Sequence, residues 1–67
     1  MKVAVLTLRK KDGREKRAVF ENEAGATRFL SEQGFTDCSD FWTHPNGIIG
    51  SIEVTERTAD MPDVLLP

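Results

Sequence analysis

Cys38 and His44 are the only cysteine and the only histidine of the chain, so they come first when nucleophilic or metal chemistry is considered. A nucleophilic cysteine requires a neighbouring base and a third group that orients this base. His44 follows Cys38 by six positions across a predicted loop and strand, and that spacing does not bring the two side chains together. We therefore expect Cys38 to be a small packing residue near a helix-to-strand link.

Metal and phosphate sites are not indicated either. A zinc site would need more histidine and cysteine residues, and the carboxylates lack the spacing of a calcium-binding loop. The sequence contains neither GxGxxG nor GxxxxGK followed by serine or threonine, and the segment Gly47-Ile48-Ile49-Gly50 is typical of a hairpin. A deep pocket of about a few hundred Å³ is also difficult to build in a domain with one helix. We expect a protein that is not an enzyme and that uses no cofactor and no metal ion.

The cations are concentrated near the N-terminus. Residues 1–20 contain seven lysines and arginines and two acidic residues, whereas residues 21–67 contain two arginines and nine acidic residues. The balances of +5 and −7 add up to the net charge of −2. Six of the cations lie in the segment RKKDGREKR, which we call the basic segment: Arg9, Lys10, Lys11, Arg14, Lys16 and Arg17.

The basic segment is a candidate nucleic-acid interface, because a basic hairpin tip can lie along phosphates or enter a groove. Charged tips also keep edge strands from pairing with other chains. No aromatic residue is interleaved among the cations for base stacking, and the chain as a whole is acidic. We therefore favour a solvated hairpin tip and keep nucleic-acid binding as the alternative. The acidic residues elsewhere are evenly spread, which favours an ordinary solvated surface over mimicry of a nucleic acid.

Two hairpins and one helix must position these residues. Residues 2–9 and 15–20 predict strands joined by a type I′ turn at Asp12-Gly13. Both faces of the first strand are apolar, so we expect a tail or a partner on the face that the helix leaves free. Asn22 predicts the N-cap of a helix of about 12 residues, which Gly34 ends as a left-handed cap.

A second hairpin is predicted from residues 40–44 and 48–57, joined by a two-residue turn at Asn46-Gly47. In this register Phe41 and Ile52 face the helix. The opposite face then carries three residues that could form an interaction site: Trp42, His44 and Ile49.

This predicted face is a docking site if it is exposed, because tryptophan is favoured as an interface anchor. Three alternatives would cover it. The C-terminal Val64-Leu65-Leu66 folds back over it, or Trp42 faces the helix instead, or a second copy of the chain buries it.

The predicted order is strand, strand, helix, strand, strand. The simplest compact arrangement is a small single α+β domain, with the helix packed on one face of a mostly antiparallel sheet. We expect this domain to span residues 1–57, and residues 58–67 to form a tail that docks on the sheet or on a partner. The chain has no apolar run long enough to span a membrane and no signal-peptide core, and it has a single cysteine, so we expect a cytoplasmic protein.

The lack of a chemical motif favours a protein-binding module that docks on a larger protein and modulates it, for example as an inhibitor. Small single domains without motifs are common among the accessory proteins of bacteriophages and mobile elements, which is an analogy of size and style alone. The alternatives are a nucleic-acid-binding accessory protein that uses the basic segment, and a homodimer.

Overall fold

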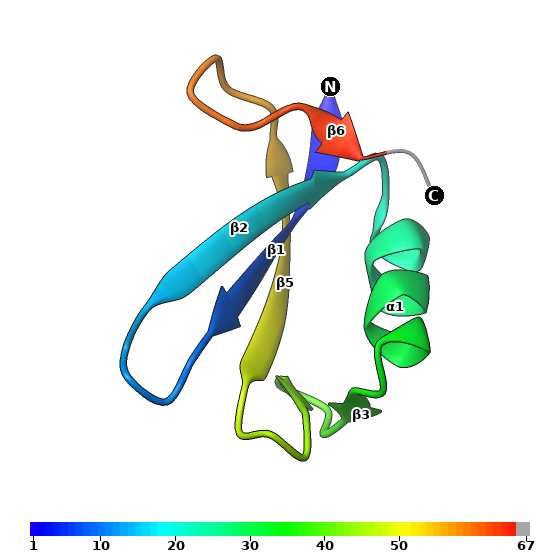
Figure 1. The fold of residues 1–67 in the computed structure, drawn as a ribbon. Coiled ribbons are helices and arrows are strands. Elements are labelled where there is room, and N and C mark those ends of the chain that lie inside the picture. Colours follow the sequence, from blue (N-terminus) through cyan, green and yellow to red (C-terminus); the bar gives the residue numbers. More distant parts are fainter. Residues whose placement is uncertain (66–67) are drawn as a thin grey trace.

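The computed structural model describes residues 1–65, and in them one helix packs on one sheet (Figure 1). The elements are β1 (Lys2–Arg9), β2 (Glu15–Phe20), α1 (Glu23–Glu32), β3 (Thr36–Asp37), β4 (Trp42–Thr43), β5 (Ile49–Glu56) and β6 (Val64–Leu65). The sheet order is β3-β4-β5-β1-β2-β6, and its neighbours are antiparallel except for the parallel pair β2 and β6. The predicted α+β fold, with a mostly antiparallel sheet and the helix on one face, is confirmed.

The hairpin of β1 and β2 forms as predicted, but its turn is of a different type. Lys10 N–H donates to the Arg14 carbonyl at 2.8 Å, and Gly13 N–H donates to the Lys10 carbonyl at 3.0 Å. Gly13 has φ +91°, whereas Asp12 stays outside the left-handed region. The loop is therefore a three-residue connection in which a type I turn precedes a left-handed glycine. The predicted type I′ turn is wrong because Asp12 keeps an ordinary φ and accepts the Arg14 N–H with its carboxylate at 3.0 Å.

The hairpin of β4 and β5 has the same kind of loop, and this shifts its register by one residue. His44 N–H donates to the Ile48 carbonyl at 3.0 Å, and Gly47 has φ +91°. Trp42 pairs with Gly50, where the sequence predicted a partner one residue later. The predicted two-residue turn would have made Pro45 the closing residue, and proline has no N–H to donate there. In the observed loop Pro45 follows His44, the turn position at which proline is favoured.

The helix α1 has the caps that the sequence predicts. Asn22 Oδ1 accepts the Gly25 N–H at 2.9 Å. At the other end, Phe35 N–H donates to the Leu30 carbonyl at 3.0 Å and Gly34 N–H donates to the Ser31 carbonyl at 3.1 Å. These are the two bonds of a Schellman motif, and Gly34 takes the left-handed conformation with φ +89°.

Apolar residues are buried on both faces of the sheet. Between α1 and the sheet, which we call the helix face, lies a cluster of five buried residues: Ala4, Leu6, Phe20, Ala26 and Leu30. On the opposite face, which we call the far face, Val3, Val5 and Val19 are buried under Met61 and Val64.

The C-terminal segment therefore folds back on the sheet, but it covers Val3, Val5 and Val19 and not the face predicted for Trp42, His44 and Ile49. β6 pairs in parallel with the end of β2, close to the N-terminus of the chain (Figure 1). This cover explains why β1 is apolar on both faces. Leu66, which the same prediction included, lies outside the described residues.

Within residues 1–65, no helix has both the length and the hydropathy that crossing a membrane would require.

Candidate docking edge

The three residues predicted to share an exposed face do not share one. The one-residue shift in register turns Trp42 toward the helix face, where it packs half-buried against the core. Ile49 lies on the far face and is 44% exposed. The predicted face of Trp42, His44 and Ile49 is therefore wrong as a geometric unit, and the alternative in which Trp42 faces the helix describes the structure.

His44 is held by neighbours on both of its ring nitrogens. Nδ1 accepts the Asn46 N–H at 3.1 Å, so the ring proton lies on Nε2, which donates to the Gln33 carbonyl at 3.0 Å. The ring also lies 4.9 Å from the Phe35 ring, measured between centroids. His44 thus joins the β4–β5 loop to the C-terminal end of α1 and stabilises the fold at this point.

Cys38 is exposed, so its prediction as a packing residue is wrong. Its Sγ lies 3.6 Å from the hydroxyl of Thr43. In the part of the chain that the structure describes, no three histidine, cysteine or acidic side chains lie close enough together to hold a metal ion.

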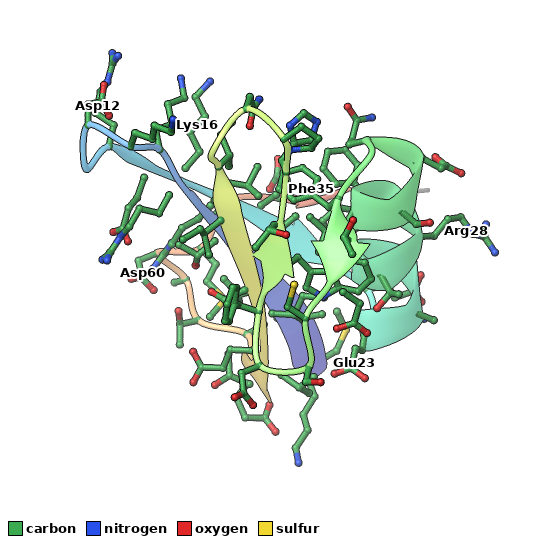
Figure 2. The ribbon with its side chains drawn as sticks, turned by 90° about the horizontal axis from the view of Figure 1, so that it is seen from below. Asp12, Lys16, Glu23, Arg28, Phe35 and Asp60 are labelled. Carbon is green, nitrogen blue, oxygen red and sulfur yellow. The ribbon has the colours of Figure 1, made fainter. Side chains whose placement is uncertain are left out.

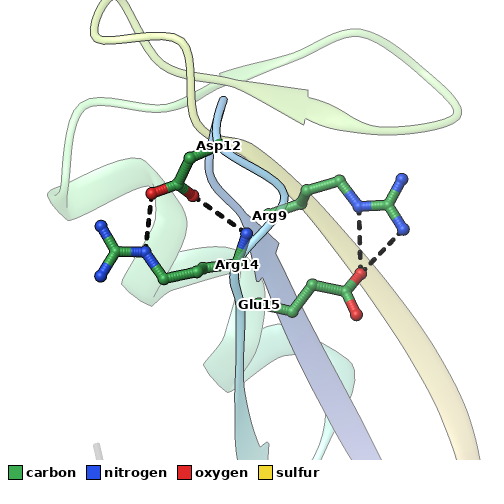
Figure 3. Close-up of polar contacts among 4 residues, drawn as sticks. All are labelled: Arg9, Asp12, Arg14 and Glu15. Atoms are coloured by element: carbon green, nitrogen blue, oxygen red, sulfur yellow. Dashed lines mark hydrogen bonds and ion pairs between the residues drawn. The ribbon is translucent and has the colours of Figure 1, made fainter.

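The basic segment is partly neutralised by its own acids (Figure 3). Arg14 Nε donates to the Asp12 carboxylate at 2.6 Å, and Arg9 lies 3.0 Å from the Glu15 carboxylate. The Arg14 backbone N–H and then its guanidinium lower the pKa of Asp12. Because these pairs are exposed, they contribute little to stability. Their effect is to reduce the positive charge that a phosphate would meet at the tip.

The sheet has one long edge without a partner strand, on the outer side of β5. β4 pairs with β5 only at Ile49 and Gly50, and no described strand continues along that side. In an antiparallel sheet, successive residues direct their N–H and C=O groups alternately to the two neighbouring strands. The bonded pair of His44 with Ile48 places the even-numbered residues of β5 on the outer side. We call the outward-directed backbone groups of Ile52, Val54 and Glu56, which no described strand pairs with, the docking edge.

The side chains beside the docking edge are apolar on the helix face. Ile52 is half-buried, and Val54 is 51% exposed although it lies in the middle of a strand. The other outer edge, that of β2, is protected differently. β6 covers it at Val19 and Phe20, and the remaining part carries charged side chains. Charged residues are the usual protection of an exposed edge, and β5 lacks it at Ile52 and Val54.

An acidic hollow of about 240 Å³ opens at the end of the docking edge, where β4 leaves β5. Trp42 and Ile52 supply its apolar wall, and the rest of its lining comes from α1, β3 and the loop before β4: Glu23, Thr27, Asp37, Ser39 and Asp40. Asp37 accepts the Ser39 N–H at 2.8 Å, which fixes the loop. Figure 2 shows Glu23 at the N-terminal end of α1, away from the hairpin tip marked by Asp12 and Lys16.

Two further hollows lie elsewhere. One, of about 310 Å³, is on the open part of the far face and is lined by Thr7, Arg9, Glu15, Ile49 and Ser51. The other, of about 300 Å³, lies between the two hairpin loops and is lined by Lys10, Lys11, Asp12, Asn46 and Ile48. The first hollow contains the ion pair of Arg9 with Glu15, and in the second Lys10 and Lys11 lie beside Asp12. Neither hollow therefore carries charge of a single sign.

Sequence reasoning did not identify Ile52 and Val54 as site residues. Pro45 is a signal for the register, because it excludes the two-residue turn, but no sequence signal gives the strand order and the short β4 that leave Ile52 and Val54 unpaired. Comparison of the chain with protein-family models, with curated proteins and with solved structures finds no match.

Proposed function

We propose that this protein is a non-enzymatic protein-binding module that docks on a larger partner through the docking edge of β5. The observation that carries the proposal is the unpaired, apolar-flanked edge at Ile52 and Val54. Such an edge offers a row of backbone donors and acceptors to a strand of another chain. Trp42 remains part of the proposed surface as a wall of the acidic hollow, whereas Ile49 and His44 are not part of it.

The biological role that we propose is modulation of the partner, with inhibition of an enzyme as the specific form. The small size of the chain suits an accessory protein of the bacteriophage or mobile-element type, which acts by covering a surface. The exposed single thiol of Cys38 is consistent with the reducing cytoplasm as the place of this binding.

Nucleic-acid binding receives less support. Arg9 and Arg14 are paired with Glu15 and Asp12, and the chain carries a net charge of −2. Homodimerisation has no feature of its own in its favour, because the C-terminal segment already covers Val3, Val5 and Val19 on the far face.

Site-specific photo-crosslinking in the producing cells tests the proposed function. A photoreactive amino acid replaces Val54 at the docking edge or, as the matched control, the exposed Ser51 of the same strand, whose side chain lies on the far face. We expect one discrete adduct with a larger protein from position 54 and none from position 51. Equal adducts from both positions, or none from either, would contradict the proposal.

A further inference from the structure

We infer that the occupant of the docking edge is an extended, basic segment of the partner protein, added to the sheet as a strand beside β5. This inference rests on the proposed function and specifies the chemistry of the partner. It predicts a segment with apolar side chains at alternate positions and lysine or arginine between them and at the end that reaches the acidic hollow.

The backbone of β5 sets the form of the occupant. Ile52, Val54 and Glu56 direct their N–H and C=O groups outward, and an added strand of about five residues would span them. The position is open because Trp42, the first residue of β4, lies opposite Gly50, and no described strand lies on this side of β5 beyond that point. An added strand would occupy this position in line with β4. An extended backbone matches this row of groups in a way that a helix does not.

The side chains on the helix face require an apolar partner. Ile52 and Val54 lie on this face, and Trp42 stands at the end of the row. Because strand side chains alternate between the faces, every second residue of the added strand would contact this apolar strip. The intervening residues would face Glu53 and Thr55 on the far face.

Charge decides between a basic and an acidic occupant. Five acidic side chains lie along the docking edge and around the hollow: Glu23, Asp37, Asp40, Glu53 and Glu56. The nearest cations, Lys2 opposite Glu56 and Arg57 after it, are at the end of β5 away from the hollow, and no cation of the described chain lines the hollow itself. Glu56 is the only one of these five acids with an ion pair among the described residues, to the N-terminal ammonium of Met1 at 2.9 Å. A lysine or arginine entering the hollow would also come close to Trp42, and the face of a tryptophan ring attracts a cation.

A second copy of the chain is a poorer occupant. Pairing β5 with β5 of another copy would bring Glu53 and Glu56 of one copy near those of the other. Pairing β5 with β2 of another copy would place the charged Lys16 over the apolar strip. Such a contact joins two different edges, so repeated copies would form open chains rather than a closed dimer.

Binding of synthetic peptides to the full chain tests the inference. The probes are a fluorescent peptide of about eight residues alternating valine and lysine, and its counterpart alternating valine and glutamate. We expect the valine-lysine peptide to bind at least about tenfold more tightly at moderate salt. Asp40→Asn, which removes one charge from the hollow, should weaken that binding by about threefold or more.

Substitutions at position 54 test whether the peptide pairs with the backbone. Val54→Pro removes an N–H that points outward, so the bonds between β5 and β1 are retained. Val54→Ala keeps the N–H and is the matched control. We expect about a tenfold loss of affinity for Val54→Pro and a loss below about threefold for Val54→Ala. Circular dichroism checks the fold, and Glu56→Pro, which also removes an outward N–H, replaces Val54→Pro if that variant unfolds.

Four results would overturn the inference: no binding of the valine-lysine peptide, equal or tighter binding of the valine-glutamate peptide, binding that Val54→Pro leaves unchanged, or self-association of the chain that Val54→Pro abolishes. A specific crosslink from position 54 would in the first three cases leave the proposed function intact. If neither the crosslink from position 54 nor binding of the valine-lysine peptide is observed, the proposed function is removed as well.

Discussion

At the scale of single residues, two glycines with the same backbone conformation differ in their surroundings. Gly13 and Gly47 both have φ +91°. A Cβ at Gly13 would meet nothing within 4 Å, whereas a Cβ at Gly47 would clash with Cε of Lys11. The Lys11 side chain therefore packs across the second hairpin loop and links the two tips.

Alanine at these positions separates the backbone effect from the packing effect. Gly13→Ala should lower the free energy of unfolding by about 1 kcal/mol, because alanine is strained at positive φ. Gly47→Ala should cost the same amount plus a smaller loss from displacement of the Lys11 side chain. Urea denaturation of both variants, and of Gly47→Ala combined with Lys11→Ala, measures the difference. A combined variant that stays much less stable than Gly13→Ala would contradict this account.

Asp12 provides a prediction on ionisation. Its pKa lies below the ordinary value of 3.8, first because of the Arg14 backbone N–H and second because of the Arg14 side chain. Arg14→Ala removes only the second cause. The pKa of Asp12 should therefore rise in the Arg14→Ala variant and still remain below 3.8, as measured by NMR titration of the Asp12 carboxyl carbon. Because the folded-state pKa is lowered, the associated stabilisation is present above the unfolded pKa and is lost as the pH falls through the folded one.

At the scale of elements, the two valines Val54 and Val64 distinguish an open edge from a covered face. Val64 packs on Val3, Val5 and Val19, whereas Val54 is 51% exposed. Val64→Ser should lower the free energy of unfolding by about 1 kcal/mol, and Val54→Ser by less than about half of that. Thermal and urea unfolding measure both variants. Equal losses would mean that β6 does not hold the far face.

The elements also show how far the sequence alone leads. The helix caps at Asn22 and Gly34 were predictable because each depends on a few adjacent residues. The antiparallel pairing of β4 with β5 was predictable, but its predicted register is one residue off because Asn46-Gly47 alone favours a two-residue turn, which the missing N–H of Pro45 excludes. The docking edge could not be predicted, because it depends on strand order and on the short length of β4, which are set by tertiary contacts.

At the scale of the whole molecule, the charges are separated in space as they are along the sequence. The basic segment lies at the tip of the β1–β2 hairpin, away from Glu23 at the N-terminal end of α1 (Figure 2). Glu23, Asp37 and Asp40 line the hollow beside the docking edge. This separation assigns different partners to the two ends of the molecule. It predicts that phosphates, if bound at all, would be bound at the tip and that a basic polypeptide would approach β5.

The tip itself should bind DNA only when its internal ion pairs are removed. Asp12 and Glu15 hold Arg14 and Arg9, and the molecule carries a net charge of −2. In a titration with a short duplex at low salt, we expect the amide NMR signals of residues 9–17 of the natural chain to stay unshifted. Asp12→Asn combined with Glu15→Gln frees both arginines and removes two negative charges, so salt-sensitive shifts should appear at the tip. Shifts at residues 9–17 of the natural chain that high salt reverses would favour the nucleic-acid alternative, and in that case the docking edge of β5 would not be the principal binding surface.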